Sequence, residues 1–141
     1  MDENLLQVRE YTDEGYRPLI DFNDWRVAIL NYIDEIHPHN NTQMERHVQT
    51  DEVFVLVRGR AILLVGGNGL QLDGAFPQPL EMGKIYNVKQ NTWHTVLMSR
   101  DAMILIVENR DTGALNSEYA EMSPEIRQQI LKLAEIEGLD K

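Results

Sequence analysis

The chain has 141 residues and a formal net charge of -10, from 13 basic and 23 acidic residues. Its length suits one domain, and a field of that sign repels nucleic acid and anionic lipid. It contains no cysteine, which excludes disulfides and thiolate metal sites. The first residues lack the pattern of a secretory signal, and no apolar stretch approaches a membrane span. We therefore expect a cytoplasmic protein without nucleic-acid or membrane partners.

Residues 1–20 are polar, and Gly15 and Pro18 interrupt them, so we expect an N-terminal arm. Residues 21–111 are predicted to form a barrel, with a loop at 76–79 and a hairpin turn at 66–69. Runs rich in β-branched and aromatic residues occur at 25–33, 44–49, 52–57, 61–65, 83–88, 92–98 and 102–108. Short runs with turn residues between them predict an all-β sandwich or barrel.

Residues 112–141 form a predicted tail, with a helix at about 124–137. Ser123 is suited to an N-cap, Pro124 to the first helical position and Gly138 to the end. One face of this helix is apolar, with Ile126, Ile130 and Leu133. We expect that face to pack on the barrel or to serve a dimer contact. The chain is thus predicted to be one domain, 1–141.

Four side chains are spaced so that they can converge. Glu45 and His47 point to the same face of a strand, and Glu52 follows across a short turn that can fold it back beside them. His94, on a third strand, can complete the cluster. Two imidazole nitrogens and two carboxylate oxygens suit Mn, Fe, Ni or Zn, whereas calcium and magnesium prefer oxygen-only ligand sets.

This spacing resembles a known family. The run Glu45-Arg-His47, four residues, Glu52, six residues and Gly59 resembles the first cupin motif. Gly83 and the eleven residues that follow it, ending at His94, resemble the second. The resemblance implies a double-stranded β-helix, the jelly-roll barrel of cupins. It also implies that His47, Glu52 and His94 match metal ligands of the family.

The chain departs from the family pattern at several positions. Glu45 replaces the first histidine, Lys89 a usual proline, Asn91 a usual glycine and Met98 a usual asparagine. Asn91 tolerates a left-handed turn, so the loop geometry can survive. A second carboxylate makes the ligand set harder, and it therefore favours Mn or Fe over Cu.

Strand alternation also predicts the surroundings of the cluster. Residues of the same parity as Glu52 or His94 should line the cavity with apolar groups, whereas Trp93 should face the opposite way and pack against the tail or arm. The residues expected to line the pocket are Phe54, Leu56, Val96 and Met98, with Gln49 and Tyr86 as polar groups that orient a ligand. His37-Pro-His39 lacks a following glutamate and is expected to be loop.

These features favour a metalloprotein that binds a small organic molecule, of the sugar or carboxylic or keto acid type, at a divalent metal. Isomerisation, decarboxylation and dioxygenation are all compatible with the resemblance. Two alternatives stay open: a non-enzymatic binding barrel, and a metal-free epimerase-like enzyme with His47 or His94 as base. Polar residues inside a barrel can also be purely structural. We expect a homodimer, because small jelly-roll domains expose strand edges that pairing can cover.

Overall fold

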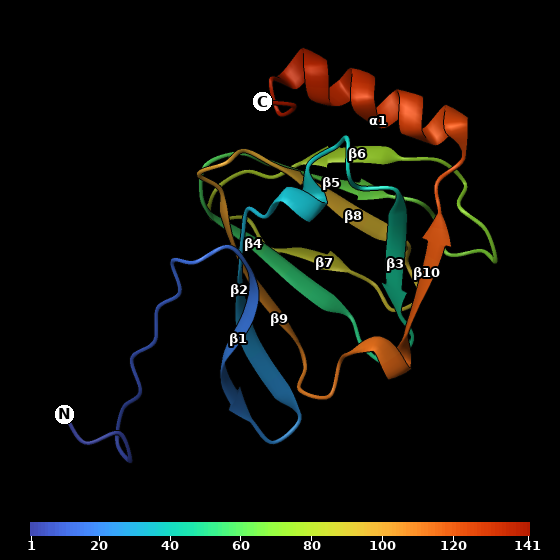
Figure 1. Cartoon of the computed structure of the whole chain (residues 1–141). Coiled ribbons are helices and arrows are strands. Elements are labelled where there is room, and N and C mark those ends of the chain that lie inside the picture. Colours follow the sequence, from blue (N-terminus) through green and yellow to red (C-terminus); the bar gives the residue numbers. More distant parts are fainter.

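The computed structural model describes residues 1–141 as ten strands in two five-stranded antiparallel sheets, followed by one helix (Figure 1). Sheet A contains, in spatial order, β1 (Gly15–Phe22), β2 (Trp25–Asn31), β9 (Met103–Asn109), β4 (Glu52–Arg58) and β7 (Tyr86–Val88). Sheet B contains β10 (Ser117–Glu121), β3 (Gln43–His47), β8 (His94–Met98), β5 (Ala61–Val65) and β6 (Phe76–Pro79). Two short 3-10 helices are η1 (Asp34–Ile36) and η2 (Ala114–Asn116). The all-β prediction is confirmed.

The two sheets face each other across one apolar interior. Residues alternate along β4 and β9, so that every second side chain is buried between the sheets. The interior cluster includes Ala28, Phe54, Leu56, Leu63, Val96, Met98, Ile104 and Ile106. Apolar packing fills one part of the barrel, and charged residues of β3, β4, β8 and β9 occupy the other.

Helix α1 (Pro124–Glu137) lies over the outer face of sheet B (Figure 1). Ser123 caps it by accepting a hydrogen bond from the Ile126 amide, and Gly138 ends it with a left-handed φ of 69°. Its apolar face packs on the barrel, as expected, and forms a second core with Met44, Leu64, Trp93, Leu97, Ile130 and Ala134. No helix of the structure is both long and apolar enough to cross a membrane.

The arm is shorter than the sequence suggested. β1 begins at Gly15 and pairs with β2 through Phe22, inside the segment 1–20 that we expected to be arm. Pro18 interrupts only locally, because the register shifts between Pro18 and Ile20. β1 is also an edge strand, where a residue without an amide hydrogen is tolerated.

Two further strands were missed. β6 covers residues 76–79, where Pro77 and Pro79 predicted a loop, and it pairs with β5 as the edge of sheet B. Residues 70–72, which follow the turn at 66–69, do not form a strand. β10 lies in the predicted tail and pairs with β3, so the barrel extends to Glu121.

Candidate metal centre

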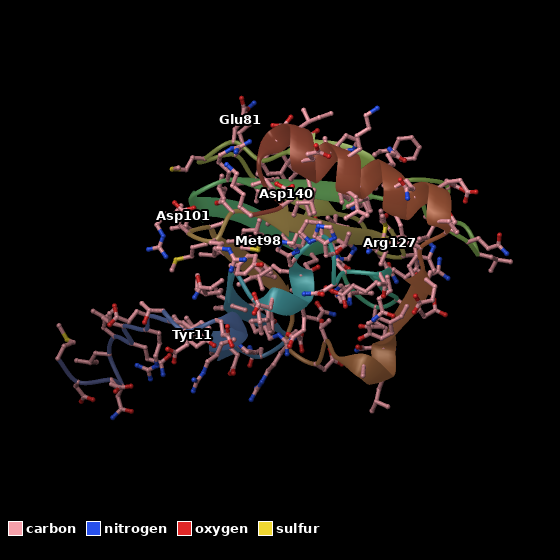
Figure 2. The ribbon with its side chains drawn as sticks, turned by 45° about the horizontal axis from the view of Figure 1, so that its top comes forward. Tyr11, Glu81, Met98, Asp101, Arg127 and Asp140 are labelled. Carbon is pink, nitrogen blue, oxygen red and sulfur yellow. The ribbon has the colours of Figure 1, made fainter.

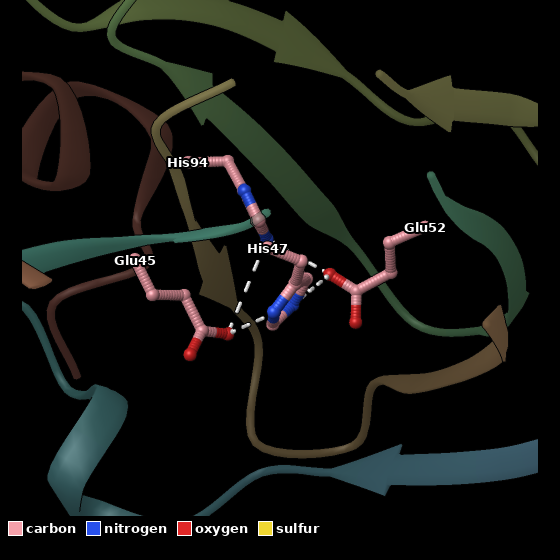
Figure 3. Close-up of side chains that lie close together, drawn as sticks. All are labelled: Glu45, His47, Glu52 and His94. Atoms are coloured by element: carbon pink, nitrogen blue, oxygen red, sulfur yellow. Dashed lines mark hydrogen bonds and ion pairs between the residues drawn. The ribbon is translucent and has the colours of Figure 1, made fainter. Parts of the chain in front are cut away.

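Glu45, His47, Glu52 and His94 meet inside the barrel, and their potential ligand atoms all lie within 4.8 Å of one another (Figure 3). Oε1 of Glu52 lies 2.8 Å from Nε2 of His94 and 3.3 Å from Nε2 of His47. Oε1 of Glu45 lies 3.8 Å and 4.0 Å from the same two nitrogens. Both imidazoles and Glu52 are buried, whereas Glu45 is partly exposed at the opening.

The four residues converge across the barrel rather than along a hairpin. Glu45 pairs directly with His94, because β3 and β8 are neighbours in sheet B. Glu52 opens β4 in sheet A and reaches the histidines from the opposite wall. The expected side-by-side hairpin of the strands at 44–49 and 52–57 is therefore wrong, although the expected convergence is correct.

Asp51 links the strand that carries Glu52 to the loop that precedes His94. Its carboxylate accepts hydrogen bonds from the Gln90 amide at 2.7 Å, the Lys89 ammonium at 2.9 Å and the Asn87 amide group at 3.0 Å. These three bonds hold the pKa of Asp51 at about 2, below its ordinary value. The start of β4 and the loop before β8 are thus held together.

The same loop contains a left-handed residue. Asn91 has a φ of 67°, which confirms the expected turn role, and its amide donates to the His47 carbonyl at 2.9 Å. This bond places the loop beside the end of β3, so that His94 enters β8 next to the histidine of the neighbouring strand.

Hydrogen bonds on the far side of each ring orient the imidazoles. Nδ1 of His94 lies 2.9 Å from the Thr92 carbonyl, which can only accept, so Nδ1 carries a hydrogen. Nδ1 of His47 bonds to the Ser117 hydroxyl at 2.8 Å. Both Nε2 atoms therefore point toward the cluster. Such outer partners are typical of histidines that bind a metal through the other nitrogen.

The cluster is electrostatically coupled. Burial alone would lower the pKa of both histidines, but the hydrogen bonds and the charge of Glu52 outweigh it and raise both values. Burial likewise opposes ionisation of Glu52, yet its bonds to the two rings hold its pKa well below the ordinary value. Burial raises the pKa of Glu45. Glu52 is thus an ionised acceptor between two imidazoles that favour protonation.

The donor set fits a divalent transition metal. It offers two imidazole nitrogens already oriented by outer hydrogen bonds and carboxylate oxygens from two separate strands. Protons shared between Glu52 and the rings occupy the positions that a cation would take, so metal binding here would displace protons. The mixed nitrogen and oxygen set matches Mn, Fe, Ni and Zn.

A cavity of about 410 Å³ opens beside the cluster. Its wall includes the four cluster residues, Arg26 and Glu108, together with apolar and neutral polar groups from both sheets. Among its lining residues are Leu30, Gln43, Phe54, Val96, Ile106, Glu108 and Tyr119. A concave site with an apolar wall and a few polar groups is the usual form of a small-molecule pocket.

Two of the six expected pocket residues line this cavity. Phe54 and Val96 lie on its wall, whereas Leu56 and Met98 lie deeper in the apolar interior. Gln49 is outside, because its side chain accepts from Asn116 and its carbonyl from Asn109. Tyr86 is also outside; its hydroxyl accepts from the Glu81 amide, in a separate shallow depression at β7. The polar lining was therefore assigned to the wrong residues.

Glu108 is a cavity residue that sequence reasoning missed. It lies opposite Arg26 across β2 and β9, and its Oε1 accepts from the Arg26 guanidinium at 2.9 Å and from the Tyr16 hydroxyl. Its Oε2 is buried without a hydrogen-bond donor and lies 3.9 Å from Nε2 of His47. Burial and the neighbouring Glu52 carboxylate raise the pKa of Glu108 to about 7. Glu108 thus extends the charged cluster toward sheet A.

A sequence signal for Glu108 was present. It follows the apolar run 103–107 and shares strand parity with Ile104 and Ile106, whose side chains are buried. A carboxylate on the core face of a strand needs a partner, and this requirement marks it as a site residue.

Known structures establish the fold. A cupin-2 domain protein of Shewanella frigidimarina is 17% identical, with a TM-score of 0.53 over 71% of this chain and 85% of that chain. The nucleoside dehydratase Pac13 of Streptomyces is 12% identical, with a TM-score of 0.53 over 84% of this chain and 96% of that chain. KdgF from Halomonas is 11% identical, with a TM-score of 0.53 over 74% and 88% of the two chains. No family profile and no curated protein matches the chain.

The barrel therefore has the cupin fold, a double-stranded β-helix, and the fold implied by the two motifs is confirmed. Within that fold, this chain is one that holds a cluster of two histidines and two glutamates beside an internal cavity.

Proposed function

We propose that the protein binds a divalent transition metal through Glu45, His47, Glu52 and His94, and that a small organic molecule binds at this metal inside the barrel. The observation that carries the proposal is the convergence of four potential ligand atoms within 4.8 Å. Two carboxylates favour Mn or Fe. When bound, the metal would supply Lewis-acid chemistry to a carbonyl, carboxylate or hydroxyl oxygen of the ligand.

The chain's own groups would position the ligand and exclude water. Phe54, Val96 and Ile106 give the cavity an apolar wall, which suits the carbon skeleton of a sugar or a carboxylic or keto acid. Gln43 and Tyr119 lie on the wall near Glu45 and offer neutral hydrogen-bonding groups. Pac13 is a nucleoside dehydratase that is also described with uridine, which makes hydroxyl-bearing small molecules a reasonable first class to test.

The test is metal uptake. The protein would be purified without metal, reloaded with Mn, Fe, Ni or Zn, and its metal content measured by mass spectrometry. We expect about one ion per chain, and we expect His94→Gln to abolish it. His39→Gln is the matched control, because His39 lies in the loop at 37–41, outside the cavity. No uptake of any of these metals at micromolar concentration would contradict the proposal.

A second candidate is a metal-free barrel, in which the bonds of Glu52 to His47 and His94 are themselves the functional arrangement. A histidine would then act as a base, or the cavity would bind its ligand without turnover. Uptake of no metal, together with a thermal shift caused by a small molecule in the same preparation, would favour this candidate.

A further inference from the structure

The charged side chains on the cavity wall are mostly acidic. Three glutamates line the cavity, with one arginine, Arg26, and no lysine. Arg26 donates two hydrogen bonds to Oε1 of Glu108 and one each to the carbonyls of Arg110 and Thr112. Its side chain is only 15% exposed. The guanidinium is thus engaged by protein acceptors, and it is not free to bind an acidic group of a ligand.

The other basic side chains of the chain lie outside the cavity. Arg127 of α1 donates to the carbonyls of Pro38, His39 and Asn41, and it does not line the wall (Figure 2). The N-terminal arm, residues 1–14, extends away from the barrel, and none of its residues lines the cavity (Figure 2). A ligand in the cavity therefore meets carboxylates and neutral groups, but no free lysine or arginine.

Glu108 presents one carboxylate oxygen to which the protein donates no hydrogen bond. Its Oε1 accepts from Arg26 on β2 and from the Tyr16 hydroxyl on β1, and these two donors hold the carboxylate in place. Its Oε2 lies on the side of the cluster, 3.9 Å from Nε2 of His47, and has no donor. The side chain is 2% exposed. Because a buried oxygen without a donor is destabilising, a ligand hydroxyl that donates to Oε2 would be favoured.

The balance of charges favours a neutral ligand over an acidic one. With a divalent ion at the cluster, Glu45 and Glu52 balance the charge of the ion, and Glu108 balances Arg26. A carboxylate or phosphate on the ligand would add a negative charge that nothing in the cavity balances, and it would face Glu108. A hydroxyl avoids this repulsion and can donate to Oε2.

We propose that Glu108 selects neutral ligands with neighbouring hydroxyl groups, such as a polyol, a sugar or a nucleoside, by accepting a hydrogen bond from one hydroxyl at Oε2 while another lies at the cluster. The separation of 3.9 Å between Oε2 and Nε2 of His47 lets one small molecule contact both groups. The inference rests on the proposed function and narrows it, because it favours sugars over carboxylic and keto acids. Glu108 is a specificity-determining residue, which Arg26 and Tyr16 position.

The experiment compares neutral compounds with their acidic counterparts: ribose with ribonate, glucose with gluconate, and uridine with uridine 5′-monophosphate. Binding to the metal-loaded full chain is measured by isothermal titration. We expect at least one neutral compound to bind, and to bind about tenfold or more tightly than its acidic counterpart. Tighter binding of the acids, or no binding of any of the three neutral compounds at millimolar concentration, overturns the proposal.

Substitutions at Glu108 test whether this residue causes the preference. Glu108→Gln removes the charge with little change of shape and leaves Arg26 without its counter-charge, so the preference for the neutral compound should fall by about tenfold. Glu108→Asp keeps the charge and should retain the preference. Glu121→Gln removes the same charge from an exposed position on β10 and is the matched control. Both members of a pair are measured on one sample, so partial unfolding of a variant does not alter their ratio. An unchanged preference in Glu108→Gln overturns the proposal.

Metal content, measured by mass spectrometry on the same samples, separates the two possible failures. A wild-type chain that takes up no metal contradicts the proposed function and, with it, this inference. A metal-loaded chain that prefers the acids contradicts this inference alone. Loss of the metal from Glu108→Gln would also overturn it, because Glu108 would then hold the metal rather than select the ligand.

Discussion

The two sheets of this barrel are built for different tasks. Sheet B is packed on both faces, against the interior and against α1, and it carries both histidines and Glu45. Sheet A is packed on one face only, and its interior carries Glu52, Glu108 and Arg26 on three neighbouring strands. The imidazoles, which need the most exact orientation, thus lie on the sheet with two packed faces, while Glu52, which contacts both of them, comes from the other sheet.

The largest effect is expected where the two sheets meet at Glu52. Glu52→Gln removes the carboxylate that both histidines contact, so metal affinity should fall by roughly a hundredfold or more. Metal-free stability should also fall by about 3 kcal/mol, because two buried imidazoles lose their charged partner. Isothermal titration and urea unfolding measure the two effects. Glu121→Gln, at an exposed position on β10, is the control, and equal losses in both variants would contradict the assignment.

A substitution where α1 packs on sheet B should destabilise the fold more than a substitution on the uncovered outer face of sheet A. Ile130→Ala on α1 truncates a side chain that is 1% exposed and leaves a cavity between the helix and sheet B. It should cost about 3 kcal/mol of unfolding free energy. Leu105→Ala, on the outer face of sheet A, should cost about 1 kcal/mol of unfolding free energy. Denaturant unfolding compares the two variants. Ile136→Ala, on the exposed side of α1, is the control and should change the unfolding free energy little. An equal cost at Ile130 and Leu105 would remove the distinction between the sheets.

Glu108 should make the metal-free protein less stable as the pH rises. Its folded pKa of about 7 lies above the unfolded value, so the folded state holds an extra proton, and stability falls between about pH 4.5 and 7. His47 and His94, whose pKa values are also raised, contribute in the same direction. In the Glu108→Gln variant, the loss of unfolding free energy between low and high pH should therefore be smaller by about 1–2 kcal/mol. Thermal unfolding of the metal-free wild type and variant at pH 5 and pH 8 measures this difference. The same change in stability between the two pH values in both proteins would show that Glu108 does not titrate in this range.

The smallest effect is expected at Asp51, on the surface link between the sheets. The depressed pKa of Asp51 means that its stabilisation is present above about pH 4 and is lost as the pH falls through about 2. Asp51→Asn should cost about 1 kcal/mol at pH 7, because the group is partly exposed, and should weaken the acid dependence of unfolding. Asp73→Asn, in the loop at 66–75, is the control, and it should change the unfolding free energy at pH 7 little. A loss at pH 7 that persists unchanged at pH 2 would exclude the ionised link.

Capping residues, motif spacing and strand alternation correctly predicted the C-terminal helix, the meeting of Glu52 with His94 and the orientation of Trp93. The capping pattern of Ser123 and Gly138 gave the helix, and the cupin-like spacing brought Glu52 and His94 to one point. Strand parity also placed Trp93 under α1, on the face opposite to the cluster. The helix and the orientation of Trp93 depend on residues a few positions apart, where the backbone geometry follows from the sequence. The convergence of Glu52 and His94, which are 42 residues apart, depended on the resemblance to the two cupin motifs.

The sequence was misleading where pairing partners lie far apart. Pro77 and Pro79 indicate a loop unless the strand is known to be an edge, which only its pairing with β5 reveals. β10 was missed for the same reason, since its partner β3 lies some seventy residues earlier. Gln49 has the parity of His47 but ends beyond β3, in a turn that directs its side chain toward the loop at 109–116.

Because Glu52 belongs to one sheet and the histidines to the other, an ion bound at this centre would add coordination bonds to the loops, hydrogen bonds and side-chain packing that connect the two sheets. Opening of the barrel would then require breaking coordination bonds. The bound state should accordingly unfold more slowly and exchange the amides of β4 and β8 together, as a single cooperative unit.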